Sequence, residues 1–145
     1  MAHMFENCDK LAKIEYNFWD FSLVNDLSYM FSNCKLLKDL KTNLYSTPLV
    51  KDTSYMFNNC SSLTSLDLSN FITEEVINME KMFYSCTGLN ELDITSFNGT
   101  KCKNFKNIFD ECYGLTVIIN NLLCPNIFPN IPNYITVINK TSFKI

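Results

Sequence analysis

The sequence lacks the features that mark several common functional classes. Only three of its 145 residues are glycine, which leaves no glycine-rich loop that could hold a phosphate group. No apolar run approaches the roughly 18 residues that a membrane-spanning helix needs, and the N-terminus has no secretory signal pattern. We therefore expect no phosphate-binding loop and no insertion of this segment into a membrane.

Charge and histidine are also scarce. The net charge is only −3, and no basic cluster predicts binding to nucleic acid. The only histidine lies in Met1-Ala2-His3-Met4, which resembles the remnant of a cloning site, so residues 1–4 are expected to lie outside the natural sequence. Without a native histidine there is no Ser-His pair, no Cys-His pair and no H-E-x-x-H motif. The sequence predicts no enzyme, no catalytic residue and no cofactor.

A strict 26-residue repeat is the dominant positive feature. It recurs without insertion or deletion, and several of its positions keep one residue type in every unit. The phenylalanine column is Phe5, Phe31, Phe57, Phe83 and Phe109; the cysteine column is Cys8, Cys34, Cys60, Cys86 and Cys112; the leucine column is Leu11, Leu37, Leu63, Leu89 and Leu115.

Each unit predicts one helix and one strand. Thr73, followed by two glutamates, is a candidate N-cap, and Gly88 is a candidate residue just beyond the helix C-terminus. Residues 89–94 alternate apolar with polar side chains after Asn90, as in a short half-buried strand. The helix follows from apolar residues spaced by three, three, one and three: Val76, Met79, Met82, Phe83 and Cys86.

A single unit could not fold alone, because ordering 26 residues costs more free energy than its few apolar side chains recover. Stacked units would bury each other's open faces and pair their strands into a parallel sheet. We therefore predict an α/β fold: a right-handed leucine-rich-repeat solenoid with one helix and one short parallel strand per 26-residue repeat.

The seven cysteines are interpreted as buried thiols. Five of them share one column, so their side chains should run parallel and not converge, as a disulfide requires. No C-x-x-C pair suggests zinc, and no metal site is predicted. Cys102 and Cys124 are expected to lie close together, and a bridge between them stays open.

The repeat ends at Cys124. Pro125, Pro129 and Pro132 follow within eight residues, which prevents a further helix, and residues 134–138 are β-branched and predict a strand over the last repeat. The expected organisation is therefore residues 1–4 as the cloning remnant, residues 4–124 as about four and a half repeats, and residues 125–145 as a C-terminal cap.

The repeat pattern Met82-Phe83-x-x-Cys86-x-x-Leu89-x-x-Leu92-Asp93-Ile94-x-x-Phe97 resembles that of BspA-like leucine-rich repeats, in particular the 26-residue variety of surface proteins and lipoproteins. The resemblance covers about residues 4–124. It implies an extracellular or cell-surface array that takes part in adhesion or host contact.

The outward strand positions are the predicted binding site. On a concave strand face they would present polar side chains to a protein or matrix ligand. Three nearby carboxylates could also suggest an acid/base pair or a calcium site, but lysines occupy the same columns in other repeats, which favours a solvated face. The competing hypothesis is a structural spacer, or an element that associates end to end with itself. The predicted binding residues are Lys13, Glu15, Asp39, Lys41, Ser65, Asp67, Glu91 and Asp93.

Overall fold

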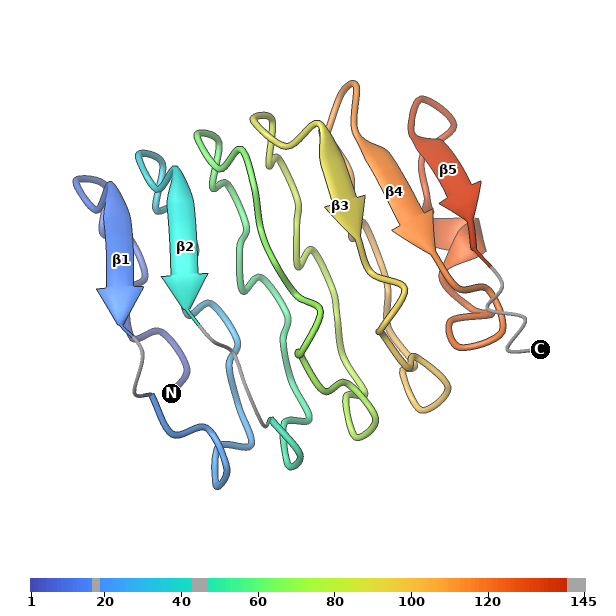
Figure 1. Ribbon diagram of the computed structural model, residues 1–145, viewed down its shortest axis with the longest axis horizontal. Helices are drawn as coiled ribbons and strands as arrows, with labels where there is room; N and C mark the ends of the chain where they lie inside the picture. The colour runs from blue at the N-terminus through green and yellow to red at the C-terminus, as the bar shows by residue number, and fades with distance from the viewer. Residues whose placement is uncertain (17–18, 43–46, 141–145) are drawn as a thin grey trace.

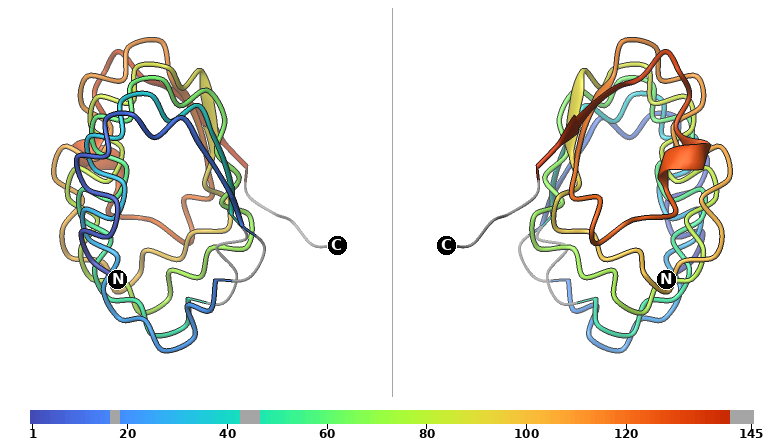
Figure 2. Two further views of the ribbon diagram at one scale, coloured as in Figure 1. Left: turned by 90° about the vertical axis from the view of Figure 1, so that its left-hand side faces the viewer. Right: turned by 90° about the vertical axis from the view of Figure 1, so that its right-hand side faces the viewer.

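The chain forms a stack of windings, each of which corresponds to one 26-residue repeat. The computed structural model describes residues 1–16, 19–42 and 47–140, and for Glu15, Tyr16, Asp39, Lys41 and Thr42 it describes the backbone alone. Successive windings lie side by side along the long axis (Figure 1) and superpose around a shared interior in the end views (Figure 2).

Short parallel strands form one side of the stack. Strand β1 (Lys13–Tyr16) pairs with β2 (Asp39–Thr42), and β3 (Glu91–Asp93), β4 (Thr116–Ile119) and β5 (Thr136–Asn139) form a second sheet in that order. Every pairing is parallel. Parallel strands are therefore present in these windings, but the strand predicted in every repeat is wrong for the winding of Ser65 and Asp67, whose described residues form none.

The predicted helices are wrong. The described residues contain one helical element, the three-residue 3₁₀ helix η1 (Phe128–Asn130), and it belongs to none of the repeats. Within the segment expected to be helical, Lys81 and Ser85 have φ angles of 51° and 56°, whereas an α-helix needs φ near −63° throughout. The fold is thus not a helix-and-strand leucine-rich-repeat solenoid but a nearly helix-free stack of windings with small parallel sheets.

The side opposite the strands consists of what we call the turn ladder, residues 27–34, 53–60, 79–86 and 105–112. Alternate N–H groups donate to the next winding, as from Lys81 to Lys106 (3.0 Å) and from Phe83 to Ile108 (3.0 Å). The N–H groups between them close tight turns three residues back, as from Tyr84 to Lys81 (3.1 Å). Each winding therefore satisfies its backbone partly within itself and partly through its neighbour.

Left-handed backbone recurs at two positions of every winding, on the side of the turn ladder. One of them is asparagine in three successive windings, Asn7, Asn33 and Asn59, with φ angles of 60°, 62° and 59°. Asparagine tolerates this conformation better than most residues. The Asn33 amide donates to Asn7 Oδ1 (2.8 Å) and the Asn59 amide donates to Asn33 Oδ1 (2.9 Å), so the side chains form a ladder parallel to the backbone ladder.

The core is a continuous stack of phenylalanine rings. The ring centroids of Phe31, Phe57, Phe83 and Phe109 lie 5.6, 5.8 and 5.7 Å from one winding to the next, with interplanar angles of at most 11°. These four side chains have no exposed surface. The phenylalanine column found in the sequence is therefore the central contact between windings.

The cysteine column lies beside these rings, as predicted, and its thiols are free and buried at Cys34, Cys60, Cys86 and Cys112. Each donates a hydrogen bond to the phenylalanine carbonyl of the preceding winding, as from Cys86 Sγ to the Phe57 oxygen (3.1 Å). The thiol thus fills a small apolar space and also bonds a carbonyl. Cys102 and Cys124 are free as well, so the structure contains no bridge between them.

Thr73 is not a helix cap, and Thr47, one repeat earlier, is placed in the same way. Both are buried, and each hydroxyl bonds the backbone of the next winding: Thr73 Oγ1 donates to the Asn98 carbonyl (3.3 Å) and accepts from the Asn98 N–H (2.7 Å). Gly88 also has another role, because a Cβ there would lie 2.7 Å from the Leu63 carbonyl oxygen. These residues connect windings.

The last winding is covered by residues 124–139. Ile127 is fully buried, Ile135 is nearly so, and η1 lies on the side opposite the strands (Figure 2). The strand predicted at residues 134–138 is present as β5, paired with β4. Among the described residues, no helix is long and apolar enough to cross a membrane.

Candidate functional site

The candidate site is what we call the strand face, the outward side chains of the strand side. In β3, Glu91 and Asp93 are exposed while Leu92 between them is buried, which is the alternation expected of a strand with one solvated face. The argument for a concave face depended on helices across from the strands, and the described residues of the windings form none. The described side chains of this face are exposed at all five predicted positions: Lys13, Ser65, Asp67, Glu91 and Asp93.

The other three predicted positions are described by their backbone alone. Glu15, Asp39 and Lys41 lie in β1 and β2, and their side chains lie outside the described residues. The parallel register aligns Lys13 with Asp39 and Glu15 with Lys41. Each of these two strands therefore carries one lysine and one carboxylate at its outward positions. In the later windings the outward residues carry no lysine and are acidic or neutral: Ser65, Asp67, Glu91 and Asp93.

Hydrogen bonds to the following turn hold the carboxylates of the strand face. Asp67 Oδ1 accepts from the Ser69 N–H (2.9 Å), and Asp93 Oδ1 accepts from both the N–H (2.9 Å) and the hydroxyl (2.7 Å) of Thr95. The backbone and side-chain hydrogen bonds from Ser69 lower the pKa of Asp67. Both carboxylates therefore present one oxygen to solvent in a defined direction.

This arrangement gives no support to metal or nucleophile chemistry in the described part of the chain. No group of three histidine, cysteine or carboxylate side chains in that part converges to hold a metal ion. Burial raises the pKa of Cys34, Cys102, Cys112 and Cys124 to about 11, so these thiols stay protonated and weakly nucleophilic at neutral pH.

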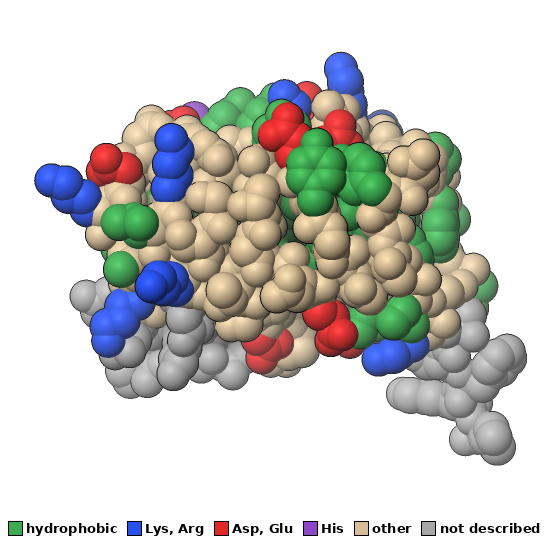
Figure 3. All heavy atoms as spheres, turned by 90° about the horizontal axis from the view of Figure 1, so that it is seen from above, with side chains coloured by type: hydrophobic (Ala, Val, Ile, Leu, Met, Phe, Trp, Pro, Cys, Tyr) green, Lys and Arg blue, Asp and Glu red, His purple; other side chains and the backbone are tan. Residues whose placement is uncertain are grey.

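A tyrosine cluster lies towards the C-terminal end of the stack. The rings of Tyr113 and Tyr134 are 4.9 Å apart and both are exposed; the Tyr84 hydroxyl donates to Glu111, whose N–H donates to the Tyr134 oxygen (2.8 Å). Seen from above (Figure 3), hydrophobic side chains gather beside acidic ones, while lysines are scattered over the rest of this face.

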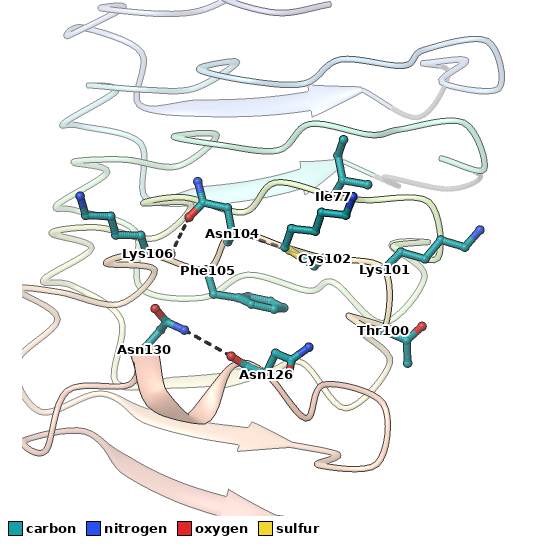
Figure 4. A pocket seen from close by; sticks show the side chains of 10 residues that line it. Ile77, Thr100, Lys101, Cys102, Asn104, Phe105, Lys106, Asn126 and Asn130 are labelled. Atoms are coloured by element: carbon teal, nitrogen blue, oxygen red, sulfur yellow. Dashed lines mark hydrogen bonds between the residues drawn. The ribbon is translucent and has the colours of Figure 1, made fainter.

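A groove at the C-terminal end of the turn ladder was not anticipated from the sequence. It has a volume of about 690 Å³, and we call it the terminal groove. Figure 4 shows Asn126 and Asn130 on one side of it and Asn104, Phe105 and Lys106 on the other. The sequence signal that could have pointed to it is the group of three lysines within six residues of the last repeat, Lys101, Lys103 and Lys106. It is lined by Ile77, residues 100–106, Asn126 and Asn130.

The fold and its surface define a repeat protein that is built from stacked windings and presents a polar strand face. The chain belongs to the family described as "Mycoplasma protein of unknown function, DUF285", whose model matches residues 1–122. No curated protein and no solved structure matches the chain.

Proposed function

We propose that this chain is a non-catalytic binding module that attaches to a protein or matrix ligand through its strand face. The observation that carries the proposal is the regular exposure of polar side chains over buried ones, as at Glu91, Leu92 and Asp93. Packing fixes the inward residues of such a strand, whereas the outward residues are constrained by solvent alone and are free to serve a ligand.

Rigidity of the supporting elements favours the same role. Leu92 is part of the buried core. The Asp67 and Asp93 carboxylates accept hydrogen bonds from the turns that follow them. A surface whose side chains are already ordered loses little conformational entropy on binding. The strand face is therefore suited to recognition of a macromolecule without a change of its own shape.

The sequence resemblance to BspA-like surface proteins supports an extracellular or cell-surface location and a part in adhesion. No enzymatic activity is included in the proposal. The roles of Glu15, Asp39 and Lys41 in ligand contact remain predictions from the sequence columns alone.

The test is adhesion of protein-coated beads to host-cell monolayers and to purified matrix proteins. The variant Asp67→Asn/Glu91→Gln/Asp93→Asn should reduce adhesion and its dependence on salt, because surface charges steer association and are screened by ions. Its melting temperature should stay close to that of the parent protein, because all three side chains are exposed.

The matched control is Asp9→Asn/Asp20→Asn/Glu74→Gln, which removes the same three charges from exposed residues outside the strand face. It should leave adhesion unchanged. Equal losses in both variants would show a general effect of net charge, and unchanged adhesion in both would contradict the strand-face proposal and favour a spacer role.

A further inference from the structure

The turn ladder ends in hydrogen-bonding groups that have no partner in the described part of the chain. In earlier windings the N–H groups of Leu27, Thr53 and Met79 donate to the next winding at 2.9, 3.0 and 2.8 Å. The equivalent N–H of the last winding belongs to Phe105, and neither it nor the N–H of Asn107 has a hydrogen-bond partner among the described residues. By the repeat, both groups point towards the segment that contains η1.

The ladder stops where the chain enters η1. The Ile77 carbonyl accepts from the Lys103 N–H (3.0 Å), whereas the Lys103 carbonyl accepts from no N–H of the described residues. The spacing shortens by one residue in the cap, because the Ile127 N–H donates to the Cys124 carbonyl as the Cys102 N–H donates to the Gly99 carbonyl. The position equivalent to Lys103 is therefore Phe128, the first residue of η1. The terminal groove has a short open parallel edge, consisting of the Lys103 carbonyl and the Phe105 N–H.

The charge of the groove is opposite to that of the molecule. Lys101, Lys103 and Lys106 line it and no acidic residue does, although the whole chain has a net charge of −3. Lys101 is paired with Glu75. Lys103 and Lys106 form no ion pair with any described residue, so two ammonium groups at the rim are available to a ligand.

We propose that the terminal groove binds an extended acidic peptide segment of a partner protein. One residue of the segment accepts from the Phe105 N–H and donates to the Lys103 carbonyl, which continues the ladder by strand addition. Acidic side chains on either side of that residue pair with Lys103 and Lys106. A sulfated or carboxylated polysaccharide could use the lysines, but it has no regular N–H and C=O groups for the open edge, and for this reason the edge favours a peptide.

Direct binding tests the proposal with a fluorescein-labelled octapeptide of alternating glutamate and threonine, since threonine favours extended backbone. Fluorescence anisotropy at low salt should show binding that Lys103→Gln/Lys106→Gln weakens by about three- to tenfold. The matched control Lys35→Gln/Lys38→Gln removes the same charge from exposed lysines of another winding and should leave the affinity unchanged. A lysine–threonine octapeptide should not bind.

Hydrogen exchange then separates strand addition from simple charge attraction. The glutamate peptide should slow exchange at the Phe105 amide, because this amide becomes a hydrogen-bond donor in the complex. Binding without this protection, equal weakening by the two lysine variants, or binding of dextran sulfate in place of the peptide would each overturn the proposal. None of these measurements involves the strand face, so failure here leaves the proposed function standing.

Discussion

At the scale of single residues, the cysteine column shows how one side chain can serve two requirements. The Cys60 thiol occupies a space with no exposed surface and donates to the Phe31 carbonyl at 3.1 Å. Alanine would fill the space without the hydrogen bond, and a larger apolar residue would press on the next winding. The reactive roles usually considered for cysteine do not apply to these thiols, because burial keeps them protonated.

The buried thiols make stability depend on pH in the alkaline range. Burial raises the pKa of Cys34 and Cys112 from 9.0 to about 11. As the pH rises from 9 to 11, these thiols ionise in the unfolded chain while the folded protein keeps them protonated, so the unfolded state is favoured. The urea midpoint should therefore be constant from neutral pH to pH 9 and should fall between pH 9 and 11.

The double variant Cys34→Ala/Cys112→Ala provides the control for this prediction. It is less stable at neutral pH, but its further loss between pH 9 and 11 should be smaller than that of the parent protein. An equal loss in both proteins would assign the effect to other groups, such as the tyrosines, and would contradict the role given to the thiols.

At the scale of one winding, the phenylalanine stack predicts that the position in the array determines the effect of a substitution. Phe83 packs between Phe57 and Phe109 and has no exposed surface, whereas Phe5 stacks on Phe31 and Trp19 and is partly exposed. Phe83→Ala should lower the free energy of unfolding by about 3 to 5 kcal/mol. Phe5→Ala should lower it by clearly less in the same denaturation experiment, and equal effects would contradict the stacking order.

The period and the inward residues of each winding could be predicted from the sequence, but the helix could not be excluded. Spacings of three and four residues bring Val76, Met79, Met82 and Phe83 inside on an α-helix, and consecutive tight turns that close three residues back have the same effect. The apolar pattern is therefore equally compatible with both. The discriminating signal was the asparagine column Asn7, Asn33 and Asn59, which favours left-handed backbone over helix.

The strand face could be predicted from the sequence, whereas the terminal groove could not, because the groove depends on how windings stack. Alternation in residues 91–93 depends on local sequence, so the exposure of Glu91 and Asp93 could be predicted. The terminal groove depends on where the cap segment that contains η1 lies relative to residues 100–106 of the last repeat. That relation requires the stacking register of the turn ladder, which the helical interpretation did not contain.

At the scale of the whole molecule, stability comes from contacts between neighbouring windings. The turn ladder, the phenylalanine rings and the cysteine hydrogen bonds all join one winding to the next, and the described strands pair with strands of adjacent windings. In such an array each unit is stabilised mainly by its neighbours. The strand face and the terminal groove are therefore both surfaces of a single repeating scaffold, one along its side and one at its end.

Far-ultraviolet circular dichroism tests the central structural claim most directly, because a helix-free stack and a helix-and-strand solenoid of the same sequence differ most in helix content. The stack of windings predicts a spectrum without the paired minima of α-helix, together with a cooperative loss of signal on heating. A spectrum with strong helical minima, equivalent to one helix in every repeat, would contradict the turn ladder and with it the terminal groove.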